Sequence, residues 1–498
     1  MSNIRVTYSG LIALTVGFAS VFTGIIFTLI VTRRLSPEDF GTWSLIGSMI
    51  TYFLVVEPII SYWSTRQIAR GEKIGKTSLF SSSVFSIGVV PIYLLLVYFV
   101  APSSGSELST LFLGVLLLPV IFISQTLVGI NLGHKPHATS YGLLGFEISK
   151  IPAGLALVYF LDLGVEGAIV AVFIAYLLKI SIQLYFAKSQ LKERFNFNTL
   201  RRWFRLAWIP IYSNISHVVW SLDVILYVTI IGSTIGVAFY AVSLSIAAVI
   251  AHAGLMSQAL YPKLIADGRY EYVKENLALL FYFAIPLLGI TILFSKYALF
   301  ALNPVYESAS IIVIMISIRT FFYVITGVLY QVLKGIEKVD VEENPTFSSL
   351  VRSKLFFVPT LGIIHTLLYA GSLTIIFIVY GSSNVSELEL VTWWALVMVS
   401  LQIPFFIYAL IQVRKTISFS FPIKPITKYV GATFAFTLVF FLTSDFIINY
   451  QISIFEYLPT LVLELAICAG VYLAITLAID KKIRDLFKAI FIEIKSGK

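Results

Sequence analysis

Residues 6–32, VTYSGLIALTVGFASVFTGIIFTLIVT, carry no charged side chain, and this stretch decides the fold class. A helix of about 20 apolar residues crosses the roughly 30 Å hydrocarbon core of a membrane. The stretch is longer than the apolar part of a cleavable signal peptide, so we expect it to be a retained first membrane span. Similar apolar runs recur as far as Ile479. The sequence therefore predicts an all-α integral membrane protein.

The composition agrees with a membrane location. Of the 498 residues, 58% are hydrophobic and only 12% are charged. A water-soluble domain cannot bury that much apolar surface. The net charge of +9 comes from side chains in short segments between apolar runs, which argues against a nucleic-acid-binding domain. The single cysteine, Cys468, permits no internal disulfide.

Charged or Gly/Pro/Asn-rich breaks divide the chain into fourteen predicted spans. They are residues 9–32, 41–62, 79–100, 109–131, 141–161, 166–187, 206–230, 236–260, 277–295, 309–333, 355–380, 391–412, 428–447 and 457–479. The organisation that we expect has five parts. They are an N-terminal six-helix lobe (1–187), a basic cytoplasmic linker (188–205), a C-terminal six-helix lobe (206–412), two additional transmembrane helices (413–479) and a basic cytoplasmic tail (480–498).

The distribution of basic residues predicts which loops face the cytoplasm. With both termini on one side, the loops of that side hold 29 of the 35 Lys and Arg residues. The opposite loops hold only Arg33, Arg34 and Lys296, against ten acidic residues. The positive-inside rule makes the basic side cytoplasmic, so both termini are predicted to lie inside a cell membrane.

The outer loops are too short for a folded external domain, and we do not expect the protein to be an enzyme. All outer loops are short, whereas integral-membrane glycosyltransferases and polymerases use long outer loops that carry acidic groups. No phosphate-binding or dinucleotide-binding glycine loop occurs, so we expect no cofactor and no direct use of ATP. His217, His252 and His365 lie in different spans without metal-ligand spacing, and no metal site is predicted.

The chain contains a sparse internal repeat. Shifting the sequence by 197 residues aligns residues 31–71 with residues 228–268 without a gap. Ser36 then meets Ser233, and Trp43 meets Tyr240. The same shift superposes span one on span seven and span two on span eight. Two parallel lobes follow, an architecture common in carriers that alternate access around a midplane site.

The segment after span one resembles a family signature. Residues 34–43, RLSPEDFGTW, are similar to the R-L-x-P-x-D/E-F-G-x-Y/W pattern of polysaccharide-unit flippases. These are the Wzx-type exporters of the multidrug/oligosaccharidyl-lipid/polysaccharide (MOP) superfamily. The second half is similar as well, at Asn214 and Asp223 in span seven and at Tyr240 in span eight.

This resemblance implies an architecture and a cargo. Members of this family fold into two lobes around a central cavity. The cavity opens alternately to each side of the membrane and is lined mainly by spans one, two, seven and eight. The implied cargo is an undecaprenyl- or dolichyl-phosphate-linked saccharide, moved from the cytoplasmic to the outer leaflet for polysaccharide biosynthesis.

Several ionisable or polar side chains lie within otherwise apolar spans, where a charge costs about 2.5 to 3.5 kcal/mol on insertion scales. Cations could hold the lipid phosphate, because an anion in the membrane must exchange its hydration for fixed donors. These candidate substrate-binding residues are Arg319, Lys150 and Lys179. The candidates for coupling to an H⁺ or Na⁺ gradient, or for a polar cavity lining, are Asp223, Glu57, Glu464, Glu147, Asn214 and His217.

Structural roles for these residues stay open. Glu147 and Lys150 are three residues apart and could neutralise each other, while Lys179 could snorkel to the cytoplasmic surface. Glu57 precedes Pro58 and could only accompany a kink. Asp223 and Arg319 could form an ion pair with each other.

Three functions compete at this stage. A lipid-linked saccharide flippase needs anchoring cations, and Arg319 and the RLSPEDFG segment favour it. A small-molecule or drug antiporter of the same superfamily would need a smaller cavity without such cations. A membrane scaffold would not need opposite charges at several depths.

Overall fold

The structure is a computed structural model that describes residues 20, 23–257, 271–337, 351–381, 383, 385–417 and 421–496. Every regular element in these ranges is a helix. Residues 23–34 are helical and include the end of the first predicted span, whose other residues lie mostly outside the described ranges.

The remaining thirteen predicted spans each coincide with observed helices. The elements of the first half are α2 (Pro37–Phe53), α3 (Pro58–Ala69), α4 (Gly75–Ser104), α5 (Leu108–Leu113), η1 (Gly114–Leu116), α6 (Leu117–His134), α7 (His137–Gly154), η2 (Leu155–Phe160), α8 (Gly164–Ala187), η3 (Lys188–Leu191) and α9 (Phe197–Arg205). The elements of the second half are α10 (Trp208–Ile231), α11 (Ile235–Ala247), η4 (Ala248–Ser257), α13 (Glu271–Leu293), α14 (Ser295–Leu302), η5 (Pro304–Ala309), α15 (Ser310–Gly335), α17 (Lys354–Gly381), α18 (Glu387–Thr416), α19 (Ile423–Ile447), α20 (Ile454–Ile479) and α21 (Lys481–Ser496).

Membrane-spanning length and apolarity support the predicted fold class. Within the described residues, 12 helices are long and apolar enough to cross a membrane, and the bent pair α2 and α3 raises the number to 13. With the partly described first helix, about fourteen spans result. The prediction of an all-α membrane protein of this size is confirmed.

The second span differs from the straight helix that residues 41–62 suggested. It consists of α2 and α3, whose axes meet at 60°. Glu57 precedes the first turn of α3, and Pro58 is its first residue. A proline lacks the N–H that would continue the hydrogen bonding of α2, so the kink expected at Pro58 is confirmed.

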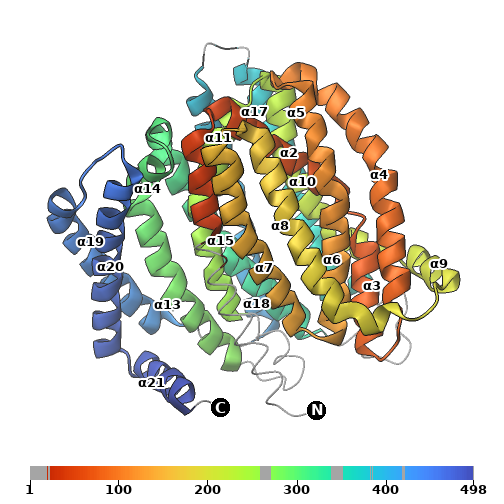
Figure 1. Ribbon diagram of the computed structural model, residues 1–498. Coiled ribbons are helices and arrows are strands. Elements are labelled where there is room, and N and C mark those ends of the chain that lie inside the picture. The colour runs from red at the N-terminus through yellow and green to blue at the C-terminus, as the bar shows by residue number, and fades with distance from the viewer. Residues whose placement is uncertain are drawn as a thin grey trace. The chain divides into compact units, whose positions relative to one another are not determined.

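The described helices form two compact units. The first comprises the described parts of Met1–Ala241 and Gly362–Val391. In it α6, α7 and α8 run side by side (Figure 1), and α2 and α4 pack against α10. Its glycines permit close approach: a Cβ on Gly41 of α2 would overlap the carbonyl of Thr234, just before α11.

The second unit comprises the described parts of Val242–Leu361 and Thr392–Lys498. Its core includes α13, α15 and the C-terminal helices α19 and α20. The hydroxyls of Tyr457 and Tyr472 on α20 donate to backbone oxygens of Tyr297 and Tyr282, at 3.1 and 2.7 Å. These units do not share the chain limits of the predicted lobes, and the division into lobes stays a prediction.

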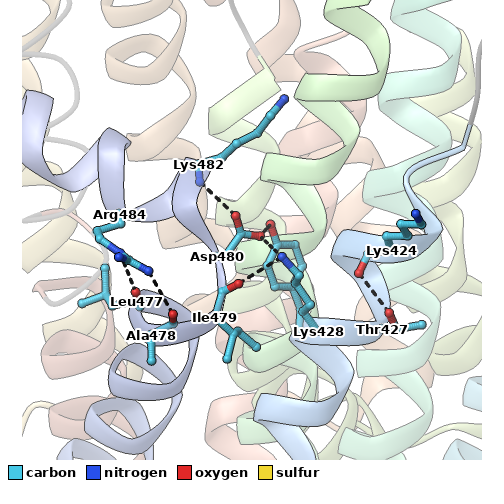
Figure 2. A network of polar contacts seen from close by, with 10 residues as sticks. Lys424, Thr427, Lys428, Leu477, Ala478, Ile479, Asp480, Lys482 and Arg484 are labelled. Atoms are coloured by element: carbon cyan, nitrogen blue, oxygen red, sulfur yellow. Dashed lines mark hydrogen bonds and ion pairs between the residues drawn. The ribbon is translucent and has the colours of Figure 1, made fainter.

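The predicted basic C-terminal segment begins with α21, which joins α20 at a polar junction (Figure 2). Buried Asp480 accepts from the backbone N–H of Lys482 at 3.0 Å, and the Lys428 ammonium lies 3.7 Å from its carboxylate. Arg484 donates to the carbonyls of Leu477 and Ala478 at 3.0 and 2.9 Å. Cations at the end of α20 and a carboxylate at the start of α21 satisfy the free backbone groups of both helices.

Candidate functional site

Asp223 lies at the centre of an aromatic cluster in the first unit. It is 3% exposed on α10 and accepts hydrogen bonds from the hydroxyls of Tyr240 on α11 and Tyr369 on α17, at 3.0 and 2.8 Å. The ring of Trp220 stacks on Tyr369 with 4.0 Å between centroids. The sequence singles out Asp223 inside an apolar span but does not indicate Tyr369, which follows more than a hundred residues later.

Two side chains of α2 form hydrogen bonds with α10, the helix that carries Asp223. The Ser48 hydroxyl donates to the backbone oxygen of Ser221 at 3.0 Å, and the Tyr52 hydroxyl donates to the same oxygen. One backbone acceptor of α10 thus receives two hydroxyl groups from α2. Spans two and seven, which the family resemblance places at the cavity, are in direct polar contact here.

Glu57 occupies the bend between α2 and α3 and is almost fully buried. The Ser61 hydroxyl donates to Oε2 at 2.8 Å, and the Thr126 hydroxyl lies 3.1 Å from Oε1 and 2.8 Å from the Ser82 hydroxyl. No Lys or Arg of the described ranges pairs with this carboxyl group. Since an unpaired buried charge costs several kcal/mol, the site suits a carboxyl group that takes up a proton or a cation.

Glu147 and Lys150 form a buried ion pair on α7, with 2.7 Å between Nζ and Oε2. The Ser20 and Thr23 hydroxyls donate to the same carboxylate at 2.8 and 2.7 Å. The expected mutual neutralisation is confirmed. A lysine already held by a carboxylate is a weaker anchor for a phosphate, because the existing pair must first separate.

Lys179 on α8 lies beside the same aromatic surface as Lys150. Its Nζ is 5.8 Å from the centre of the Phe146 ring and 5.5 Å from that of Tyr176. The Lys150 Nζ is 5.1 Å from the Phe146 ring. Two lysines therefore share one phenyl ring in cation–π distance.

In the second unit, Arg319 on α15 is 8% exposed, and its guanidinium carbon lies 4.5 Å from the centre of the Tyr323 ring. One turn further along, Thr326 accepts from the side-chain amide of Gln402 on α18 at 3.2 Å. These two polar side chains of α15 thus have an aromatic ring and an amide group as neighbours. The predicted pairing of Arg319 with Asp223 would join the two units and stays a prediction.

Glu464 on α20 is fully buried. The Thr443 hydroxyl of α19 donates to Oε1 at 2.6 Å, and Oε2 has no hydrogen-bond partner among the described residues. Glu464 lies within the C-terminal helix pair, far along the chain from the spans that the resemblance assigns to the cavity.

The two remaining candidates lie on the opposite face of α10. The Asn214 amide donates to the carbonyl of Pro210 in its own helix at 2.8 Å. His217 is exposed, one turn later. In the described ranges, no three His, Cys, Asp or Glu side chains are placed to hold a metal ion.

A pocket of about 430 Å³ lies among the ends of several helices of the first unit. Most of the residues that line the pocket are acidic, carry a hydroxyl group or are glycine. The lining residues are Glu38, Asp39, Thr42, Ser104, Gly105, Ser106, Glu107, Thr110, Leu163, Gly164, Val165, Glu166, Gly232, Ser233 and Thr234. The four acids lie at or near helix N-termini, which favour negative charge. The sequence placed them in outer loops but did not predict that they share a pocket.

Comparisons with known proteins give the fold a context. No protein-family model matches this chain, and no curated protein matches it. Among solved structures, the chain is similar to the lipid II flippase MurJ in an inward closed conformation, with a TM-score of 0.66 and 16% identity over 96% of this chain and 100% of the other.

Two further structures are an inward-facing and an outward-facing multidrug resistance MATE family transporter of the MOP superfamily. Their TM-scores are 0.59 and 0.57 at 13% and 14% identity, and the matches cover 82% and 84% of this chain. They cover 98% and 96% of those transporters. The chain has the fold of MOP-superfamily members, and the narrower Wzx-type resemblance stays a prediction.

Proposed function

We propose that the protein is a transporter that moves a lipid-linked saccharide across the membrane by alternating access. The observation that carries the proposal is the length of the structural match. The match to the lipid II flippase covers 96% of this chain, whereas the matches to the MATE transporters cover 82% and 84% of it. Nearly the whole of each MATE chain takes part in its match, so the part of this chain left over has no counterpart there. The two helices beyond twelve, α19 and α20, are part of the second unit's core. A lipid-linked saccharide has a long polyprenyl chain to accommodate, which the substrate of a drug antiporter does not have.

In this proposal Arg319 holds the lipid phosphate. Its guanidinium is buried beside an aromatic ring, and a planar guanidinium can donate two parallel hydrogen bonds to a phosphate. Lys150 is less suited because Glu147 already holds it at 2.7 Å. Lys179, in the first unit, is the other candidate cation.

Glu57 is the residue that we propose for coupling transport to an H⁺ or Na⁺ gradient. Among the described residues its carboxyl group has only hydroxyl partners, and it occupies the 60° bend of the second span. Gaining or losing a positive charge there changes the electrostatic free energy at the point where the helix direction changes. Asp223, which accepts two tyrosine hydroxyls, is the alternative coupling residue.

A small-molecule antiporter is the second candidate function. The similarity to the MATE transporters favours it, and so does the aromatic cluster of Trp220 and Tyr369 next to Asp223, since aromatic rings and a carboxylate together suit an organic cation. Both functions use the same fold, so transport measurements must separate them.

The test is reconstitution in liposomes that contain a fluorescent polyprenyl-diphosphate saccharide. We expect the wild type to move the lipid between leaflets and Arg319→Ala to lose this activity while keeping its thermal stability in detergent. Lys296→Ala is the control, because Lys296 is exposed and pairs with Glu307 at 3.1 Å. Uptake of a small organic cation without movement of any lipid-linked saccharide would show that the protein is an antiporter and not a flippase.

A second arm tests the coupling residue. Glu57→Gln keeps the hydroxyl contacts but cannot take up a proton, so its transport should no longer respond to an imposed proton or sodium gradient. Ser61→Ala, which removes one hydroxyl donor, should keep the response. If transport by Glu57→Gln still responds fully to the gradient, Glu57 is not the coupling residue and Asp223 becomes the candidate.

A further inference from the structure

The short helix α9 is fixed on the first unit by one side. Its side-chain cap is Asn196, whose backbone N–H donates to the Thr77 hydroxyl of α4 at 3.0 Å. Trp203 is 1% exposed, and its indole N–H donates to the Gln67 side chain of α3 at 2.9 Å. A helix of this length is not stable alone in water, so these contacts hold it in place.

The other side of α9 carries unneutralised positive charge. Arg201, Arg202 and Arg205 are all exposed, and no carboxylate of the described ranges forms an ion pair with any of them. Glu193, the acid nearest in sequence, is exposed and unpaired as well. Arg202 and Arg205 lie in the last turn, where the helix dipole favours a cation, but Arg201 has no such reason to be there.

Exposed aromatic rings lie at the same place. Phe197 is 66% exposed. Phe204 stacks on Phe85 of α4 with 5.2 Å between centroids, and Phe195 packs edge-on against Phe80 of α4 at the same distance. The same stretch of α4 exposes the large apolar side chains Phe80, Val84 and Ile87, as expected of a lipid-facing helix. The rings therefore extend the apolar surface of a membrane span directly into the basic helix.

We propose that α9 is a binding surface for acidic phospholipids of the leaflet that the positive-inside rule assigns to the cytoplasm. The three guanidinium groups bind the headgroup phosphates, for which their planar donors are suited, while Phe197 and Phe204 lie among the upper acyl carbons. Basic residues with membrane-level aromatic rings fit a lipid surface better than a soluble polyanion. The proposal does not depend on what the protein transports.

The first experiment measures lipid binding to the full chain. In nanodiscs of phosphatidylcholine, adding phosphatidylglycerol should raise the melting temperature of the wild type. The triple variant Arg201→Gln, Arg202→Gln, Arg205→Gln should lose this response and bind phosphatidylglycerol on the order of 100-fold more weakly, from roughly 1 kcal/mol per basic residue. Equal melting temperatures of variant and wild type in pure phosphatidylcholine show that the variant is folded.

A matched control distinguishes the effect of the α9 arginines from the effect of the protein's net charge. The triple variant Arg414→Gln, Lys415→Gln, Lys424→Gln removes the same charge from exposed positions elsewhere on the same predicted side. It should keep the response to phosphatidylglycerol. An equal loss in both triple variants would overturn the proposal, and so would a response of the phosphatidylcholine nanodiscs to inorganic phosphate alone at matched ionic strength.

The second experiment locates the helix. Because the only cysteine, Cys468, is fully buried, Asn198→Cys provides an exposed thiol for an environment-sensitive fluorophore. Its emission should shift to shorter wavelength when phosphatidylglycerol is added, and the shift should vanish in the arginine triple variant. An emission that does not respond to lipid composition would contradict the proposal.

Discussion

At the scale of single residues, the buried carboxyl groups differ in their partners. Glu147 faces the ammonium group of Lys150 at 2.7 Å, whereas Asp223 receives two tyrosine hydroxyls. Glu464 has one hydroxyl donor and one oxygen without a partner in the described part of the chain. The partner decides whether a carboxyl group is a structural ion, a hydrogen-bonded acceptor or a neutral acid.

Glu464 should therefore tolerate replacement of its carboxyl group by a neutral amide. Glu464→Gln has the same shape and keeps an acceptor for Thr443, so its free energy of unfolding should stay within about 0.5 kcal/mol of the wild type. The infrared band of a protonated carboxyl group should be weaker in this variant. A strong destabilisation by Glu464→Gln, with no change in that band, would mean that Glu464 is ionised.

Asp223 should behave in the opposite way. Tyr369→Phe removes one hydroxyl donor to its carboxylate and should destabilise the protein by about 1.5 to 3 kcal/mol, the usual range for a hydrogen bond to a charged group. Tyr98→Phe on α4, where the tyrosine is 64% exposed, is a control of identical chemistry. Thermal unfolding in detergent measures both, and equal melting temperatures for the two variants would contradict an ionised Asp223.

At the scale of elements, α2 illustrates why a signature residue has to be small. Gly41 is the glycine of the RLSPEDFG segment, and a Cβ there would overlap the Thr234 carbonyl before α11. Ser36 and Ser233, which the internal repeat aligns, each accept from a backbone N–H at a helix start, at 3.1 and 3.2 Å. The two repeats therefore begin their helices in a similar way.

Replacement of the two glycines of α2 should have opposite effects. Gly41→Ala forces α2 away from the Thr234 backbone and should destabilise the protein by about 1 to 3 kcal/mol. A Cβ at Gly47 meets nothing within 4 Å, so Gly47→Ala should stabilise the helix by up to about 1 kcal/mol. Melting temperatures of the two variants test this, and a neutral Gly41→Ala would refute the close approach.

At the scale of the whole molecule, the distribution of charge predicts the sidedness of every loop. Lys424 lies at the start of α19 and Glu456 at the start of α20, with α19 between them, and both are exposed. The basic loop is expected inside the cell and the acidic loop outside.

Labelling with a membrane-impermeant maleimide tests this topology. Glu456→Cys should react in intact cells, whereas Lys424→Cys should react only after permeabilisation. The wild type provides the background, because Cys468 is buried. The reverse pattern would invert the proposed topology, and labelling of both positions from one side would show that α19 does not span the membrane.

The sequence determined the features that depend on short-range chemistry. Apolar runs located thirteen described spans because a backbone in lipid must satisfy its hydrogen bonds within each helix. The Pro58 kink and the Glu147–Lys150 pair were also predictable, since each involves residues within one turn of a helix. The buried carboxyl groups could be named for the same reason, as charges inside apolar runs.

Only the tertiary structure decided what surrounds those groups. Tyr369 reaches Asp223, and Thr126 reaches Glu57, from helices distant in the chain. No periodicity encodes such contacts in a chain this apolar, because membrane helices pack by shape and small residues and not by a distinctive pattern of hydrophobicity. The acidic pocket arises in the same way, from helix ends that the loops bring together. The sequence thus determined which residues carry charge into the membrane, and the packing of the helices determined what each charge can do.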